Sequence, residues 1–144
     1  TPHDANESVG FVFRCGGSKL SILTDAGHVS ERMLDAVAGS SLILIESNHD
    51  VDMLKAGRYP YPLKKRILGD FGHLSNDACG AALPALYGRG VRRAVLGHLS
   101  RENNFESLAL ETVRGALRAS DIPDEAFALS VAHRDRVGER YQID

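Results

Sequence analysis

Ser41-Leu42-Ile43-Leu44-Ile45-Glu46-Ser47 is the stretch of this sequence that decides the fold. Its apolar residues are continuous, and the run has the length of one strand rather than of a helix. A strand without alternation is typical of a sheet that is covered on both faces, as in α/β proteins. The run therefore predicts a buried strand inside a sheet that helices flank.

Further strands are expected on both sides of this run. Val91-Arg92-Arg93-Ala94-Val95-Leu96 ends on β-forming residues, and residues 126–132 form a similar run. Near the start of the chain, residues 9–15 and 19–24 are rich in β formers and flank Gly16-Gly17. Two such runs around a Gly-Gly pair predict an antiparallel hairpin.

Helical patterns alternate with the later strands. Capping residues, apolar stripes and closing glycines mark them. They cover residues 30–39, 50–56, 62–68, 76–87 and 104–119. An antiparallel hairpin followed by alternating helices and strands predicts an α/β layered fold. Residues 1–144 are expected to form one unit with neither a linker nor a second domain.

The composition is that of a soluble globular protein. The 144 residues are 43% hydrophobic and 25% charged, and the net charge of −2 supplies no global field that attracts nucleic acid. Cys15 and Cys79 are far apart in no metal-binding spacing, which indicates reduced thiols of a cytosolic protein. The sequence shows neither a run that could span a membrane nor a signal peptide. We therefore expect a cytoplasmic protein with no membrane partner.

Three residues that can bind metal stand next to predicted strands. His3 precedes the hairpin, Asp25 follows its second strand, and His98 follows the strand that ends at Leu96. Ligands gather at the carboxyl ends of strands in α/β sheets, and imidazoles with a carboxylate suit a hydrolytic metal site. Each residue alone has a plainer interpretation, such as a turn aspartate or a hydrogen-bonded loop histidine. Together they favour a metal site, although they cannot complete a two-metal one.

A series of motifs accompanies these residues. In chain order it reads Glu46-Ser47-Asn48-His49-Asp50, Met53-Leu54-Lys55-Ala56-Gly57-Arg58-Tyr59-Pro60, Leu63-Lys64-Lys65-Arg66-Ile67, Gly72-His73-Leu74-Ser75-Asn76 and His98-Leu99-Ser100 with Asn103-Asn104 nearby. The chain resembles the second half of a metallo-β-lactamase-fold hydrolase of the YycJ/WalJ branch. The resemblance implies half of a four-layered αββα sandwich. It also implies a metal-dependent hydrolase with proposed 5′-to-3′ DNA exonuclease activity.

The same resemblance implies roles for the metal-binding residues. His3 and His98 match histidine ligands of the first and second metal, and Asp25 matches the aspartate that bridges both. The family's His-x-His-x-Asp-His motif, which normally precedes the position of His3, is absent from this sequence. That motif supplies most of the metal ligands and the aspartate that orients the attacking water. We therefore expect the chain to be the C-terminal half of one hydrolase domain and to be inactive alone.

The implied cofactors are two divalent metal ions, zinc or else manganese, which would activate a water for attack on a phosphodiester. His73 resembles a histidine that assists the leaving group in related nucleases, a task that suits a protonated imidazole. Its alternative is a histidine at a helix entry. Glu46 and His49 end the apolar strand and are expected to orient His73 or a metal ligand. A local carboxylate–imidazole pair without function is an equally open interpretation.

One compact basic cluster is interleaved with aromatic residues. Lys64, Lys65 and Arg66 are consecutive, Arg58 lies upstream, and two tyrosines stand between them. Basic side chains contact phosphates and aromatic rings stack on bases, which is how single strands are held. The alternative is one solvated helix face. We expect the cluster to bind nucleic acid, with DNA favoured over RNA.

Other functions stay open at this point. The fold could serve RNA, a thioester or a lactone, since His-Asp-His residues do not separate these substrates. The absent motif would also fit a metal-free binding or regulatory module. Half a sandwich would leave an apolar sheet face uncovered. We therefore expect the chain to associate with its missing N-terminal half or with a second copy of itself.

Overall fold

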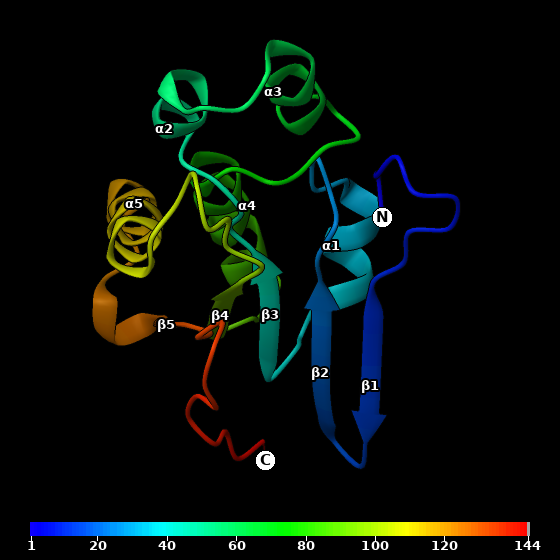
Figure 1. The fold of residues 1–144 in the computed structure, drawn as a ribbon. Coiled ribbons are helices and arrows are strands. Elements are labelled where there is room, and N and C mark those ends of the chain that lie inside the picture. Colours follow the sequence, from blue (N-terminus) through cyan, green and yellow to red (C-terminus); the bar gives the residue numbers. More distant parts are fainter. Residues whose placement is uncertain (144) are drawn as a thin grey trace.

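The computed structural model describes residues 1–143 and holds a five-stranded sheet in the order β1-β2-β3-β4-β5 (Figure 1). The hairpin pair β1–β2 is antiparallel, and the later pairs are parallel. The elements in chain order are β1 (Phe11–Cys15), β2 (Ser18–Leu23), α1 (Glu31–Val37), β3 (Leu42–Glu46), α2 (Val51–Ala56), α3 (Tyr61–Ile67), α4 (Asn76–Gly88), β4 (Arg93–Gly97), α5 (Glu106–Ala119), the 3₁₀ turn η1 (Asp124–Ala126) and β5 (Ala128–Val131).

The structure confirms the α/β class and every predicted strand and helix, with shifts of a few residues at their ends. The hairpin turns through Gly16, whose φ of 57° is readily adopted only without a side chain. Helices α1, α2 and α4 begin after Ser30, Asp50 and Ser75, and each of these side chains accepts a hydrogen bond from the first helical turn. The sequence patterns missed only the short turn η1, which lacks a side-chain cap.

The hydrophobic core lies between one face of the sheet and three helices. Ile43 and Ile45 of β3 and Leu96 of β4 point into it and are fully buried. Helices α1, α4 and α5 cover this face with the buried residues Leu34, Val37, Cys79, Leu83, Leu86, Ala109, Val113 and Leu117. Helices α4 and α5 approach closely at Gly80. A Cβ added at Gly80 would lie only 2.8 Å from the Cβ of Ala116, so the contact requires glycine there. Burial of these apolar side chains is the main stabilising term of the fold.

The opposite face of the sheet is partly open. Phe11 and Phe13 of β1 are each 51% exposed, and their rings stack with centroids 6.1 Å apart. Phe11 pairs with Ile22 of β2, which pairs with Leu44 of β3, so an apolar row crosses the face. The strands thus present their second apolar side to solvent, as half of a layered sandwich would.

Helices α2 and α3 lie beyond the carboxyl ends of the parallel strands (Figure 1). The long connection from β3 to β4 therefore crosses the same sheet edge at which Asp25, Glu46 and His98 stand. Within residues 1–143, no helix is both long and apolar enough to cross a membrane.

Candidate metal centre

Side chains from strand ends and from one loop converge at the carboxyl edge of the sheet. Glu46 is the last residue of β3 and pairs with Gly97, so His98 follows at the same level. Asp25 comes shortly after β2, and His73 lies in the loop before α4. The loop is fixed there, because His49 and Ser75 form an isolated parallel bridge. Long-range pairing thus gathers residues that are far apart in sequence.

Glu46 is the centre of the cluster. Its side chain is fully buried, and its Oε1 lies 2.7 Å from Nδ1 of His73 and 2.7 Å from Nδ1 of His98. Its Oε2 accepts a hydrogen bond of 3.0 Å from the backbone N–H of Ala26. An ionised carboxylate can only accept, so both imidazoles donate from Nδ1. In the neutral ring each histidine therefore keeps the lone pair of Nε2 for another partner.

The charges within the cluster are coupled. Burial alone would raise the pKa of Glu46, but the hydrogen bonds from His73, His98 and Ala26 outweigh it and lower the pKa to about 2. The hydrogen bond to Glu46 in turn raises the pKa of His98. The buried carboxylate is therefore ionised throughout the physiological pH range.

Asp25 faces the same space without a hydrogen bond to any of the rings. Its Oδ1 lies 3.7 Å from Nδ1 of His98, 3.8 Å from Nδ1 of His73 and 3.9 Å from Nε2 of His3. Its ligand atoms and those of Glu46, His73 and His98 lie within 4.8 Å of one another. Carboxylates and imidazoles are the donor types that zinc or manganese accepts, and since Nδ1 of each ring is bonded to Glu46, Nε2 is the ring atom left for an ion. The residues present therefore fit a divalent metal ion.

His3 stands beside this group rather than inside it. Its Nδ1 lies 2.8 Å from the carbonyl oxygen of Gly72, and its ring centroid lies 4.8 Å from that of His73. The N-terminal segment is held here by hydrogen bonds from Gly27 N–H to Pro2 and from Asp4 N–H to Phe71. The remaining ring nitrogen of His3, Nε2, lies 3.5 Å from Oδ1 of Asp4 and 3.9 Å from Oδ1 of Asp25, so it stands at the margin of the cluster.

His49 lies behind the cluster. It is 1% exposed, and within the described residues both of its ring nitrogens lack a hydrogen-bond partner. Burial and the nearby His73 lower the pKa of His49 to about 4. Its backbone carbonyl accepts from the N–H of Asn76, which fixes the start of α4. The backbone of His49, rather than its ring, thus supports the loop that carries His73.

The predicted basic cluster is only partly at the site. Arg66 lines the cleft next to the histidines and forms a paired hydrogen bond with Asp4, with Nη2 to Oδ1 at 2.9 Å. Lys64 donates to the carbonyl of Lys55 at 2.6 Å and so joins α3 to α2. Arg58 and Lys65 are exposed on the surface. The structure therefore brings Arg66 to the site and leaves the other three residues outside the cleft.

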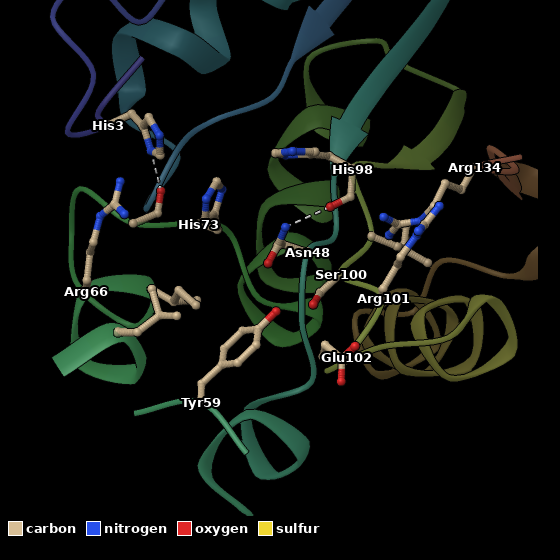
Figure 2. Close-up of a pocket in the computed structure, with 14 residues that line it drawn as sticks. His3, Asn48, Tyr59, Arg66, His73, His98, Ser100, Arg101, Glu102 and Arg134 are labelled. Atoms are coloured by element: carbon tan, nitrogen blue, oxygen red, sulfur yellow. Dashed lines mark hydrogen bonds between the residues drawn. The ribbon is translucent and has the colours of Figure 1, made fainter. Parts of the chain in front are cut away.

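The histidines open into a cleft of about 480 Å³. Figure 2 shows Arg66 on one side of it, Arg101 and Arg134 on the other, and the hydroxyl of Tyr59 pointing inward. Sequence reasoning missed Arg101 and Arg134 as cleft residues. Arg101 could have been found from its place three residues after His98, whereas the C-terminal segment of Arg134 carries no local signal.

Comparison with known proteins finds relatives that the chain matches over part of their length, and a structural neighbour. No family model matches the chain. The chain is 40% identical over 115 residues to exodeoxyribonuclease YycJ of Bacillus anthracis, covering 80% of this chain and 44% of the relative. It is 41% identical over 120 residues to exodeoxyribonuclease WalJ of Streptococcus pneumoniae D39, covering 83% and 45%. The chain thus spans less than half the length of the curated relatives that it matches.

A solved structure shows the same fold. Zinc-bound PqqB of Methylobacterium extorquens superposes with a TM-score of 0.55 at 22% identity, over 86% of this chain and 40% of that one. PqqB is a metallo-β-lactamase-fold protein. The five-stranded sheet with flanking helices is the part that the two share. The chain therefore shares the fold of PqqB and is similar in sequence to the YycJ and WalJ exodeoxyribonucleases over less than half of their length.

Proposed function

We propose that this chain is the C-terminal half of a metal-dependent phosphodiesterase that degrades DNA from its 5′ end. The observation that carries the proposal is the shared contact of His73 and His98 with Oε1 of the buried Glu46, opposite Asp25. The names of the curated relatives, exodeoxyribonucleases YycJ and WalJ, support a nucleic-acid substrate. The arginines that line the cleft suit the phosphates of that substrate.

The residues divide into ligands and supporting groups. His98 and Asp25 would hold a divalent ion, zinc or manganese, with His3 contributing from the margin. A pair of such ions, when bound, would lower the pKa of a water and neutralise charge on the scissile phosphate. Glu46 holds Nδ1 of both inner histidines, which aims Nε2 of each ring away from the core. The buried carboxylate thus fixes both rings through one atom.

His73 is the residue proposed to move a proton. It is half-buried, and its Nδ1 donates to Glu46 while its ring lies at the wall of the cleft. The carboxylate of Glu46 fixes the orientation of the ring through this hydrogen bond. A protonated ring could donate from Nε2 to the departing oxygen of the phosphodiester and take a proton back from water afterwards. The exchange leaves the ring and its carboxylate unchanged over one cycle.

The chain alone is proposed to be inactive. Its described histidines and carboxylates provide one compact group of ligands. The open sheet face with Phe11 and Phe13 is the surface on which the other half of the sandwich would pack. The remaining metal ligands would come from that half.

The proposal is tested with protein made from the complete coding sequence. A 5′-labelled and a 3′-labelled DNA strand are incubated with zinc or manganese, and the products are followed on a gel. We expect shortening from the 5′ end and a loss of about 10²-fold or more in the Asp25→Asn variant. Asp52→Asn makes the same change at an exposed carboxylate of α2 that does not line the cleft, and this control should retain activity. Intact DNA with the wild-type protein, or full activity in Asp25→Asn, would refute the proposal.

A further inference from the structure

The cleft at the histidines continues into a second cavity. This second cavity measures about 360 Å³. It shares four lining residues with the first, namely Leu99, Ser100, Arg101 and Arg134. From there it extends to Phe105, at the start of α5, and to Arg136. The two cavities therefore form one groove that leads from His98 to the N-terminal end of α5.

The arginine side chains of this groove differ in whether they already have a hydrogen-bond or ion-pair partner. Arg101 pairs with Asp135 at 3.1 Å, and Nη2 of Arg136 lies 3.2 Å from Nε2 of His133. The acidic residues that line the groove are Glu102, Glu106 and Asp135, and Glu106 is paired with His133 at 2.9 Å. Within residues 1–143, Arg134 lines both cavities without a hydrogen bond or ion pair. Its guanidinium is thus free to bind an anion.

An aromatic ring stands at the far end of the same groove. Phe105 precedes α5 and is 53% exposed. Exposure of a large apolar ring costs free energy that a stacked partner would recover. An unpaired base offers such a partner, since every base has a flat face on which a ring can stack. A base inside a duplex is already stacked on its neighbours and offers no such face. A groove that carries arginines and ends on an exposed aromatic ring therefore fits a single nucleic-acid strand rather than a duplex.

We propose that this groove guides a single nucleic-acid strand away from the metal centre, with a phosphate on Arg134 and a base on Phe105. The proposal rests on the proposed function and adds to it the path and the single-stranded form of the substrate. It assigns the binding of the strand to the loops after β4 and β5. The basic residues of α3 are then secondary contacts.

The phosphate contact is tested by the salt dependence of binding. A fluorescein-labelled oligo(dT) is titrated with the chain in chelator, so that it is not degraded, and Kd is measured by anisotropy at several salt concentrations. Loss of one phosphate contact should lower the slope of log Kd against log salt by about 0.7 in Arg134→Ala. Arg140→Ala removes the same charge in the same segment but lines neither cavity, so its slope should equal that of the wild type.

The base contact is tested by single-tryptophan variants, because the chain contains no tryptophan. In Phe105→Trp, oligo(dT) should quench the tryptophan emission through stacking on a base. Tyr61→Trp places the probe on α3, where Tyr61 is 77% exposed and lines neither cavity, and its emission should stay constant. Quenching in Tyr61→Trp alone would place the strand over α3 and overturn the proposal.

The outcomes separate this inference from the proposed function. If the wild-type chain binds oligo(dT) but Arg134→Ala and Arg140→Ala have equal slopes, the path is wrong while the nuclease function stands. If duplex DNA binds more tightly than the single strand and does not quench Phe105→Trp, the single-stranded form is wrong. If neither the chain nor the complete protein binds or degrades DNA, both proposals fail together.

Discussion

Oδ1 of Asp25 lies 3.7 Å from Nδ1 of His98, and both residues have a positive φ, 54° and 57°. Residues other than glycine adopt this left-handed conformation at a cost, and such residues cluster at functional sites. Each follows a strand of the sheet, so both left-handed residues stand at the carboxyl edge where the cluster forms. The conformation of these two residues is therefore part of how the cluster is assembled.

The left-handed conformation of Asp25 predicts a difference between two substitutions. Asparagine tolerates this conformation almost as aspartate does, whereas a β-branched residue does not. Asp25→Val should therefore lower the free energy of unfolding by about 1–2 kcal/mol relative to Asp25→Asn. Urea unfolding of the two variants measures the difference. Equal midpoints would show that the backbone at Asp25 is not strained.

The different roles proposed for His73 and His98 predict that one substitution lowers activity alone and the other lowers both activity and metal content. If His73 moves a proton and His98 holds the metal, His73→Gln in the complete protein should lose about 10²–10⁴-fold in kcat and keep its metal content. His98→Gln should lose both. Elemental analysis beside the DNA degradation assay measures the two quantities. A His73→Gln protein that has also lost its metal would make His73 a ligand instead.

The burial of His49 predicts a pH-dependent stability. Its pKa is about 4 in the folded state and 6.5 in an exposed chain. Between these values the unfolded state binds a proton that the folded state does not, so the free energy of unfolding falls as the pH drops from about 6.5 to 4. The full loss corresponds to about 3 kcal/mol.

Comparison with His49→Leu isolates this effect. The charged and titratable groups that act on His49, namely His73, Glu46, Asp50 and Asp77, are common to both proteins. The stability difference between wild type and His49→Leu should therefore change with pH only in this window. Urea unfolding at pH 4 to 8 gives the two curves. Parallel curves throughout would contradict a neutral, buried His49.

A buried amide network predicts a large loss of stability at Asn104. Its Nδ2 donates to the carbonyls of Ser47 and Asn48 at 2.9 and 3.1 Å, and to Oδ1 of Asn76 at 2.9 Å. Asn104→Ala takes the donor from the carbonyl of Ser47 and the acceptor from Nδ2 of Asn76, whereas the carbonyl of Asn48 keeps the N–H of Ser100 and Oδ1 of Asn76 keeps the hydroxyl of Ser47. Two buried polar groups without a partner cost about 3 kcal/mol. Asn6→Ala, at an exposed position, is the matched control and should change stability by less than about 0.5 kcal/mol. Similar denaturation midpoints for both variants would refute the network.

The open sheet face predicts self-association of the isolated chain. Phe11 and Phe13 lie on the edge strand β1 and are half exposed, so a second apolar surface would cover them favourably. Sedimentation of the wild-type chain should show dimers, and Phe11→Ser with Phe13→Ser should give a monomer. Phe71→Ser removes a ring that is 62% exposed but lies in the loop before His73, and should still dimerise. A monomeric wild-type chain would contradict this prediction.

Much of the fold was predictable because its signals are local. The continuous apolar run of β3, the Gly-Gly hairpin and the capping residues Ser30 and Ser75 are each read within a few neighbours. The places of Asp25 and His98 after strands were equally local. Their convergence on Glu46 depends on parallel pairing between β2, β3 and β4, which the resemblance implied.

The remainder of the site depends on contacts between distant residues. Arg66 is paired with Asp4, 62 residues away, and no pattern near either residue indicates the pair. Arg134 reaches the cleft only because β5 lies parallel to β4 and sends the following segment towards His98. The sequence around α3 therefore drew attention to a basic run, most of which the structure places outside the cleft.

The most direct test of the proposed metal centre is elemental analysis of metal per chain, on this chain and on protein made from the complete coding sequence. A two-ion site divided between two halves predicts about two zinc or manganese ions in the complete protein and few in the isolated chain. Asp25→Asn should lower the content of the complete protein. Absence of bound metal from the complete protein, after reconstitution with zinc and with manganese, would contradict the metal-dependent hydrolase and leave a binding role for the fold.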